Sequence, residues 1–147
     1  MGNLIICDID GTIANNDHRQ NLLVEFKDWD LFFSKMSEDL PIKPVIEIIK
    51  EEYKSGKKIC FLTGRPDRYR DVTSTWIEKH LNITQFVLHM RQDDDHRDKV
   101  SVKREMFEQN FNLKDIDYFV ENDKDLIKLW EENGTKVLDV NKFTQDS

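Results

Sequence analysis

The chain has 147 residues, 38% of them hydrophobic and 35% charged, which suits a single domain, residues 1–147, with a substantial core. Its net charge of −7 repels phosphate backbones, so strong nucleic-acid binding is not expected. No run approaches the roughly 20 apolar residues of a membrane span, and the N-terminus lacks a signal-peptide pattern. Cys7 and Cys60 lie in apolar runs, which favours buried, reduced thiols and a cytoplasmic protein.

Strand and helix patterns alternate along the chain. Apolar runs predict five strands, at residues 3–9, 57–64, 85–90, 116–122 and 135–140. Helical periodicity and end signals predict helices at residues 44–56, 67–81, 102–111 and 124–134. This order predicts an α/β fold, in which a five-stranded, mainly parallel sheet is flanked by helices. Trp76 and Trp130 fall on apolar helix faces, so both are expected in the core.

Residues 13–43 break this alternation between the first strand and the first long helix. A connection of this length that contains its own aromatic residues is usually a lid or a small subdomain. We therefore expect a small, partly helical cap inserted after the first strand, over the site. The sequence contains no G-x-x-x-x-G-K-[ST] loop, so a kinase domain is not expected.

Polar residues follow four of the predicted strands at their carboxyl ends. They are Asp8 and Asp10 after the first strand, Thr63, Gly64 and Arg65 after the second, Arg91 after the third, and Glu121, Asn122 and Asp123 after the fourth. In a parallel sheet these ends meet at one edge, where ligands bind near the switch in strand order. Chance placement of polar loop residues explains any one of these ends easily, but all of them poorly.

Asp8 and Asp10 end the first strand only two positions apart. Two carboxylates held close together need a cation between them, or one of them must take up a proton. A divalent cation such as Mg²⁺ binds one or two carboxylates together with substrate phosphate, and a protonated carboxyl group can act as a general acid. The alternative is a surface turn in which an aspartate caps a helix.

The stretch DIDGTIA, which contains Asp8 and Asp10, resembles the first motif, DxDGT, of the haloacid dehalogenase (HAD) superfamily. Thr63 in FLTGR, Lys103 in SVKRE and the run VENDKDLIKLW resemble the second, third and fourth motifs in the same order. The resemblance covers essentially the whole chain. It implies a Rossmann-like HAD fold and a magnesium-dependent phosphomonoesterase that works through an aspartyl-phosphate.

The same resemblance implies a role for each motif residue. Asp8 would be the nucleophile, and Asp10 would be the general acid and then the base. Thr63 would hydrogen-bond a phosphoryl oxygen, and Lys103 would neutralise charge on the nucleophile and the phosphate. Mg²⁺ would be bound by Asp8, by the main-chain carbonyl of Asp10 and by an oxygen of the fourth motif. Asn122 stands where that motif usually has an aspartate, and Asp123 and Glu121 are the alternatives.

A finer resemblance is to the 3′-phosphatase domain of phage-type polynucleotide kinase-phosphatases, through DHR, DWDLF, TGRP, TSTWIEKH and LHMRQDDDHRDKVSVKREMF. It implies a phosphomonoester substrate, either a DNA or RNA 3′ end or a nucleotide. The residues expected to bind its phosphate are Thr12, Arg19, Gly64, Arg65 and Arg91. Arg97 is a weaker candidate, for which a surface ion pair is an equal alternative. Trp29, in the cap, is a candidate substrate contact.

Some features favour other interpretations. Lys99 stands where that family has an acid, four residues before the motif lysine, and Asp98 lies beside it. The acidic net charge also suits a small-molecule or mononucleotide phosphatase, including a 5′-nucleotidase. A domain that binds phosphate without turnover, similar to a receiver domain, is the alternative of another class.

Overall fold

The computed structural model describes residues 2–24 and 29–144. Five strands form its central sheet: β1 (Leu4–Cys7), β4 (Lys58–Pro66), β5 (Val87–Arg91), β6 (Ile116–Glu121) and β7 (Lys136–Asp139). The strand order is β5-β4-β1-β6-β7, and each neighbouring pair is parallel. The predicted α/β fold with its parallel sheet is confirmed. Because the chain builds outward from β1 first on one side and then on the other, the carboxyl end of β1 is the topological switch point.

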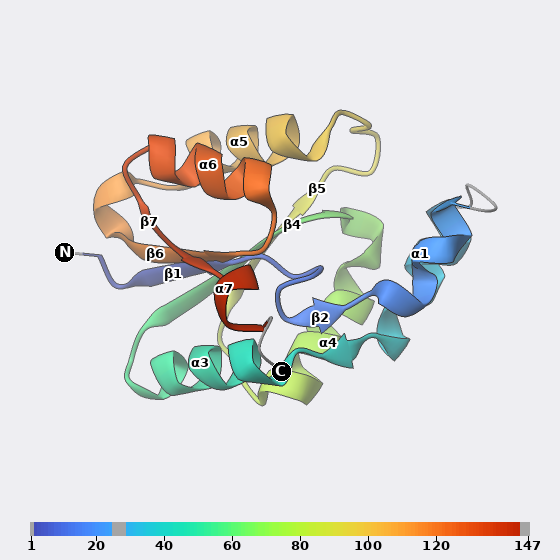
Figure 1. Cartoon of the computed structure of the whole chain (residues 1–147), viewed down its shortest axis with the longest axis horizontal. Coiled ribbons are helices and arrows are strands. Elements are labelled where there is room, and N and C mark those ends of the chain that lie inside the picture. The colour runs from blue at the N-terminus through green and yellow to red at the C-terminus, as the bar shows by residue number, and fades with distance from the viewer. Residues whose placement is uncertain (1, 25–28, 145–147) are drawn as a thin grey trace.

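Two layers of helices enclose the sheet (Figure 1). The helices α3 (Lys43–Lys54) and α4 (Arg70–Leu81) cover one face, and α5 (Lys99–Asn110) and α6 (Lys124–Glu132) cover the other. Side chains of β1 alternate between the two cores: Ile5 and Cys7 pack on the α3 and α4 side, and Ile6 packs on the α5 and α6 side. This burial on both faces explains why the strand reads as a continuous apolar run.

The expected core tryptophans are confirmed. Trp76 on α4 is buried, and Trp130 on α6 is fully buried and stacks on Phe119 with ring centroids 4.4 Å apart. Cys7 and Cys60 are buried free thiols. Within residues 2–24 and 29–144, no helix combines the length and the hydropathy needed to cross a bilayer.

Two helices begin at positions that differ from those predicted. α5 begins at Lys99 instead of residue 102, because the Asp98 carboxylate accepts the main-chain N–H of Ser101 and caps the helix one turn earlier. Residues 67–69 form a separate 3₁₀ turn, η2 (Asp67–Tyr69), so α4 begins at Arg70. Shorter elements near the chain's end are η3 (Leu113–Asp115) and α7 (Asn141–Thr144).

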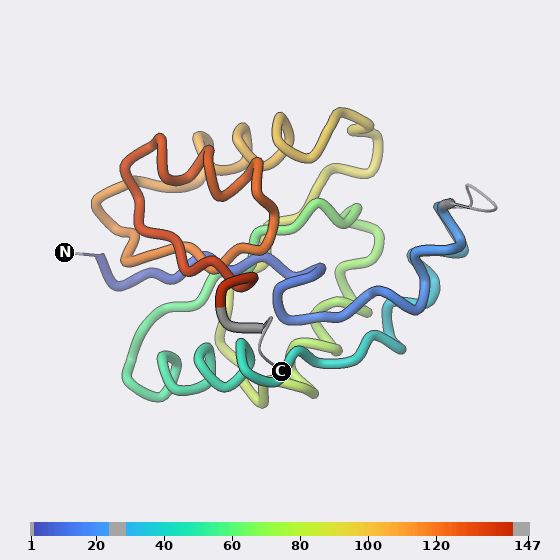
Figure 2. Tube along the Cα trace, viewed as in Figure 1, coloured from blue at the N-terminus to red at the C-terminus, as the bar shows by residue number. Residues whose placement is uncertain are grey.

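The segment between β1 and α3 projects from the carboxyl edge of the sheet. It contains β2 (Ala14–Asn15), α1 (Asp17–Val24), α2 (Trp29–Ser34), η1 (Met36–Glu38) and β3 (Leu40–Pro41). Figure 2 shows the chain running outward from the end of β1 and returning alongside itself, and the antiparallel pairing of β2 with β3 closes this loop. Residues 25–28 of the predicted cap lie outside the described residues. Buried Phe32 and Met36 anchor the segment to the domain.

Candidate active site

A cavity of about 300 Å³ lies at the carboxyl edge of the sheet. The residues that line it are Asp8, Asp10, Gly11, Asn16, Gln20, Thr63, Gly64, Lys99, Lys103, Asn122, Asp123 and Leu126. The lining includes six of the residues that follow the predicted strands: Asp8, Asp10, Thr63, Gly64, Asn122 and Asp123. Arg65, Arg91 and Glu121, which were expected at the same edge, do not line this cavity. Asn16, Gln20, Lys99 and Leu126 also line the cavity, although the sequence analysis assigned a site role to none of them.

Asp8, which directly follows β1, lines this cavity. Its main-chain N–H donates to the carbonyl of Val120 (3.0 Å), so it continues the pairing of β1 with β6. Lys103 Nζ donates to Asp8 Oδ1 (2.5 Å), and the Thr12 hydroxyl lies 3.0 Å from Asp8 Oδ2. Burial opposes the charge on Lys103, but Asp8 and Glu121 outweigh it and raise the pKa of the ammonium group. The lysine therefore stays protonated beside the Asp8 carboxylate.

The turn after β1 places Gly11 against the side chain of Asn122. Gly11 has a φ of +79°, and a β-carbon there would lie 2.3 Å from Asn122 Nδ2. The amide thus rests directly on the glycine, and Asn122 Oδ1 lies 3.1 Å from the Thr12 hydroxyl. The Thr12 hydroxyl is therefore within hydrogen-bond distance of an Asp8 oxygen and of the Asn122 amide oxygen. The Asp8 and Asn122 oxygens therefore converge on the buried Thr12 hydroxyl, and both Asp8 and Asn122 line the cavity.

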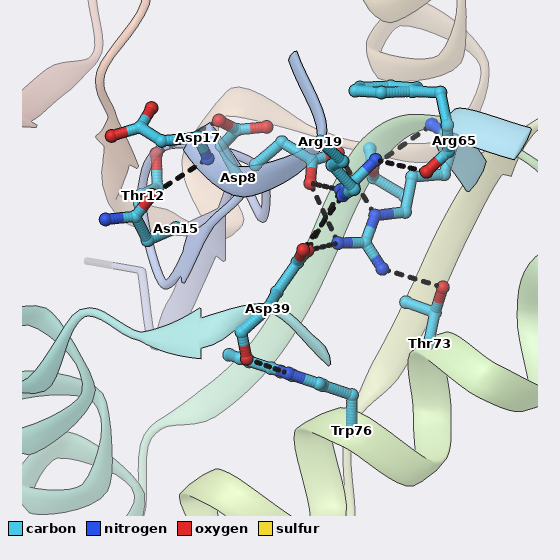
Figure 3. A network of polar contacts seen from close by, with 12 residues as sticks. Asp8, Thr12, Asn15, Asp17, Arg19, Asp39, Arg65, Thr73 and Trp76 are labelled. Carbon is cyan, nitrogen blue, oxygen red and sulfur yellow. Dashed lines mark hydrogen bonds and ion pairs between the residues drawn. The ribbon is translucent and has the colours of Figure 1, made fainter. Parts of the chain in front are cut away.

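Asp10 forms ion pairs with Arg19 and Arg65. Figure 3 shows these two arginines together with Asp39. Arg65 donates to both of its carboxylate oxygens, from Nε (3.1 Å) and Nη2 (2.8 Å). Arg19 Nη2 donates to Asp10 Oδ1 (2.9 Å). Burial would raise the pKa of Asp10, but the two guanidinium groups outweigh burial and hold the pKa below its ordinary value. Asp10 is therefore ionised in this arrangement, while its side chain, 29% exposed, still faces the cavity.

Asp39 completes the network from the cap. It accepts hydrogen bonds from Arg19 Nε (2.8 Å) and Nη2 (2.9 Å) and from Arg65 Nη2 (3.1 Å), and its side chain is fully buried. Figure 3 shows its carboxylate directed at both guanidinium groups, while Trp76 donates to its main-chain carbonyl (2.9 Å). His18 Nε2 lies 2.7 Å from its Oδ1. Nothing in the sequence around Asp39 marked it as part of the site, because its partners lie on distant segments.

The arginines predicted to bind phosphate have different surroundings. The side chains of Arg19 and Arg65 are almost completely buried, and they bind protein groups behind Asp10 without lining the cavity. Arg91 donates three hydrogen bonds to the main-chain carbonyls of Gly64, Asp95 and Arg97. Arg97 forms ion pairs with Asp95 and Glu105, as its alternative interpretation expected. Direct phosphate contact by Arg19, Arg65 or Arg91 stays a prediction.

The three fourth-motif candidates lie in different environments. Glu121 is buried, and its Oε2 accepts the main-chain N–H groups of Asn122 (3.1 Å) and Asp123 (3.3 Å). Burial and the nearby charge of Asp8 raise the pKa of Glu121. Asp123 Oδ1 caps α6, and its Oδ2 pairs with Lys99. Asn122 differs from both, because its side-chain oxygen and an Asp8 oxygen share the Thr12 hydroxyl.

These residues suit a cation that needs few protein ligands. Over the part of the chain that the structure describes, no three His, Cys, Asp or Glu side chains are grouped so as to hold a metal ion. Mg²⁺ typically uses one or two carboxylates and completes its octahedron with water and substrate phosphate. The converging oxygens of Asp8 and Asn122 fit that requirement, whereas they do not form an all-protein metal cage.

Comparison with known proteins gives a family and several relatives. Residues 2–144 match the family model described as the polynucleotide kinase PNKP phosphatase domain. A protein of Autographa californica nuclear polyhedrosis virus, described as a putative bifunctional polynucleotide kinase/RNA ligase, is 27% identical over 130 residues, which are 87% of this chain and 18% of the viral protein.

Solved structures show the same fold. A chain of the Pnkp1/Rnl/Hen1 complex superposes with a TM-score of 0.79 at 24% identity, over 94% of this chain and 46% of that chain. The class C acid phosphatase from Bacillus anthracis, with tungstate bound, gives a TM-score of 0.61 at 20% identity, over 95% of this chain and 66% of the phosphatase. The chain thus spans less than half the length of the viral relative and of the Pnkp1/Rnl/Hen1 chain.

Proposed function

Because this chain belongs to the family of the polynucleotide kinase PNKP phosphatase domain and is therefore a HAD-type phosphatase, we propose that it hydrolyses 3′-phosphate ends of polynucleotides or nucleotides with the help of Mg²⁺. The observation that supports this proposal best is the buried Asp8 carboxylate, 2.5 Å from the Lys103 ammonium at the carboxyl end of β1. A carboxylate so placed can attack phosphorus while the adjacent cation neutralises the incoming phosphate charge.

The reaction proceeds in two steps. An oxygen of Asp8 forms a bond to phosphorus as the bond from phosphorus to the leaving alcohol breaks, and the alcohol oxygen takes a proton from Asp10. Water then attacks the phosphorus of the aspartyl-phosphate and gives a proton to Asp10. The bond between phosphorus and the Asp8 oxygen breaks, so phosphate leaves and the Asp8 carboxylate is restored. Thr63 lines the same cavity, and its hydroxyl oxygen accepts the N–H of Arg65 (3.1 Å), so its O–H can donate to a phosphoryl oxygen.

Arg19 and Arg65 act on this chemistry by positioning Asp10. They hold its carboxylate with three hydrogen bonds and favour the ionised form, which is the form needed to accept a proton from water. The acid step needs the protonated form. The negative charge of a bound phosphate opposes ionisation of Asp10, so substrate binding raises its pKa toward that role.

Asn122 is the fourth-motif residue that we assign to the metal. Mg²⁺ would be held by the Asp8 carboxylate, the Asp10 main-chain carbonyl and the Asn122 amide oxygen, and when bound it would neutralise charge on the phosphate. An amide carries no charge, so the affinity for Mg²⁺ is expected to be weaker than with an aspartate there. Asp123 and Glu121 are less suitable, because capping, ion-pair and main-chain hydrogen bonds already occupy their oxygens.

A polynucleotide or nucleotide substrate is supported by the family and by the viral relative, which is described as a putative polynucleotide kinase/RNA ligase. The mononucleotide and small-molecule alternatives keep the same chemistry and change only the leaving alcohol. Membership of a phosphatase family leaves the receiver-like alternative without support. Cytoplasmic location stays a prediction.

The test is phosphate release from a 3′-phosphorylated oligonucleotide and from 3′- and 5′-mononucleotides, with Mg²⁺ or with a chelator. Asp8→Asn should reduce release to background, and the chelator should do the same. Asp117→Asn is the matched control, because Asp117 is also an aspartate bound to a lysine, Lys57 (2.7 Å). This pair lies at the amino ends of β6 and β4, away from the catalytic cavity. Asp117→Asn should retain activity.

Each result has a distinct meaning. Release from mononucleotides alone would overturn the polynucleotide substrate and keep the mechanism. Equal activity of Asp8→Asn and the wild-type protein would overturn the nucleophile. Release that continues undiminished in the chelator would overturn the metal requirement.

A further inference from the structure

A second cavity, of about 430 Å³, lies next to the catalytic one. Gly64 lines both cavities, so the two adjoin, and a leaving group that extended past Gly64 from a phosphate bound at Asp8 would enter the second. Trp29 and Phe33 of α2 form its aromatic wall, and its lining also includes Arg91 at the end of β5 and Arg97 in the loop that follows. The second cavity therefore lies between the cap and the loop that follows β5.

The aromatic wall is preassembled. Trp29 stacks on Phe33 with ring centroids 5.7 Å apart and an interplanar angle of 29°. Phe33 packs on Tyr69 of η2, with centroids 5.1 Å apart, and this contact ties the wall to the domain. Trp29 nevertheless remains 57% exposed. A tryptophan that is supported by aromatic neighbours yet open to the cavity offers a rigid flat surface for a planar ligand.

The charges of the second cavity nearly cancel. Arg68 lies 3.5 Å from Asp30 and 3.8 Å from Asp93, and Arg97 pairs with Asp95 at 2.8 Å. Such a lining neither attracts nor repels a polyanion strongly, so it suits a neutral planar group. Arg91 differs from Arg68 and Arg97, because its three hydrogen bonds go to main-chain carbonyls instead of carboxylates. One of these carbonyls belongs to Gly64 (2.8 Å). The positive charge of Arg91 thus lies where the two cavities meet, next to the phosphate position.

We propose that the second cavity binds the nucleoside of the leaving group, with its base stacked on Trp29. This proposal rests on the proposed phosphatase function and narrows its substrate to a nucleoside 3′-phosphate, free or at the end of a strand. Stacking on an aromatic side chain tolerates every base, so selection among the four bases is not expected. A phosphomonoester without a base would use the catalytic cavity alone.

The kinetic test compares a nucleoside 3′-monophosphate with glycerol phosphate, which has no base. Trp29→Ala should lower kcat/KM for the nucleotide about tenfold and leave glycerol phosphate unchanged. Trp29→Phe, which keeps an aromatic ring, should recover most of the loss. Leu113→Ala is the control, because Leu113 is also exposed and apolar (51%) but lies on η3, before β6. Equal losses on both substrates, or no loss on either, would overturn the proposal.

A binding measurement separates this proposal from the proposed function. Tryptophan fluorescence of Asp8→Asn, which cannot turn over substrate, is titrated with a nucleoside 3′-monophosphate and with inorganic phosphate. Stacking on Trp29 predicts quenching by the nucleotide that phosphate alone does not produce, and that Asp8→Asn/Trp29→Phe lacks. Quenching without hydrolysis by the wild-type protein would keep the subsite and overturn the phosphatase substrate. Identical quenching by both ligands, or in both variants, would overturn the subsite.

Discussion

At Gly11 two constraints act on one residue. Its φ of +79° disfavours any side chain, and a β-carbon would also strike Asn122 at 2.3 Å. Gly56 shares only the first constraint, because its φ is +96° and a β-carbon there would meet no atom within 4 Å. Gly56→Ala should therefore lower the free energy of unfolding by about 1–2 kcal/mol, and Gly11→Ala should lower it further because its β-carbon also collides with Asn122. Only Gly11→Ala should also lose most of the phosphate release, because it displaces Asn122.

Urea unfolding and phosphate release measured on both variants check this prediction. Full activity in Gly11→Ala would show that the contact with Asn122 does not matter for the site. Equal loss of activity in Gly56→Ala would show that the backbone strain, and not the displaced amide, is responsible.

Asp39 balances the charge of two buried arginines. Without its carboxylate, Arg19 and Arg65 share Asp10 as their one ion-pair partner among the described residues. Asp39→Asn should lower the free energy of unfolding by about 3–5 kcal/mol, since it leaves buried charge uncompensated. Activity should fall as well, because the guanidinium groups would shift and Asp10 would move with them.

The surface pair of Asp117 and Lys57 provides the comparison for Asp39. Their side chains are 31% and 28% exposed, so Asp117→Asn should cost less than about 1 kcal/mol. Chemical denaturation of both variants checks the difference. An Asp39→Asn protein as stable as Asp117→Asn would mean that water or a shifted side chain replaces the missing charge.

At the scale of helices, the N-cap residues Asp123 and Asp98 allow the stability of a helix end to be separated from metal binding. Asp123 caps α6 by accepting the N–H groups of Asp125 (3.0 Å) and Leu126 (3.1 Å), and Asp98 caps α5 in a similar way. Asp123→Ala and Asp98→Ala should each cost about 1 kcal/mol of stability. Because we assign the metal to Asn122, the Mg²⁺ concentration for half-maximal activity should rise in Asn122→Ala and change little in Asp123→Ala.

Unfolding experiments and Mg²⁺ titrations of the three variants test this assignment. A larger rise in Asp123→Ala than in Asn122→Ala would transfer the ligand role to Asp123. Asp98→Ala is the control, because any change in its Mg²⁺ requirement comes from fraying of a helix end and not from loss of a metal ligand.

At the scale of the whole molecule, the two thiols report on opening of the central sheet. Cys7 and Cys60 lie on neighbouring strands, β1 and β4, and face opposite cores. Burial raises the pKa of Cys60 from 9.0 to about 12 and also raises that of Cys7. Both thiols should react with an aromatic disulfide reagent at pH 8 only at the rate of global unfolding, and rapidly in denaturant.

The raised thiol pKa values also set a pH dependence. An unfolded chain ionises its thiols near the ordinary value of 9.0, while folded Cys60 stays protonated up to a pKa of about 12, so these groups should lower stability as pH rises through that window. Stopped-flow absorbance of the thiol reaction and unfolding curves at several pH values test both statements. Rapid reaction of either thiol in the native protein would contradict the expected burial.

Much of this protein follows from local sequence patterns. Periodicity along the chain determines the alternation of strands and helices, the parallel sheet and the burial of Trp76 and Trp130, because each depends on residues close together in sequence. The positions of Asp8 and Thr63 at strand ends likewise predict a shared edge, because parallel strands place their carboxyl ends together. Lys103 was expected there from the resemblance of SVKRE to the third HAD motif. The structure brings these three residues to one cavity.

Only the tertiary structure determined how the remaining charges are partnered. Asp39 meets Arg19 and Arg65 because the cap folds back over α4, and this path leaves no local periodicity to detect. The same packing turned two predicted phosphate ligands toward Asp10, set Asn122 against Gly11 and left Trp29 beside a cavity. Partners far apart in sequence are chosen by the close packing and charge neutralisation of the whole domain, which a linear pattern does not encode.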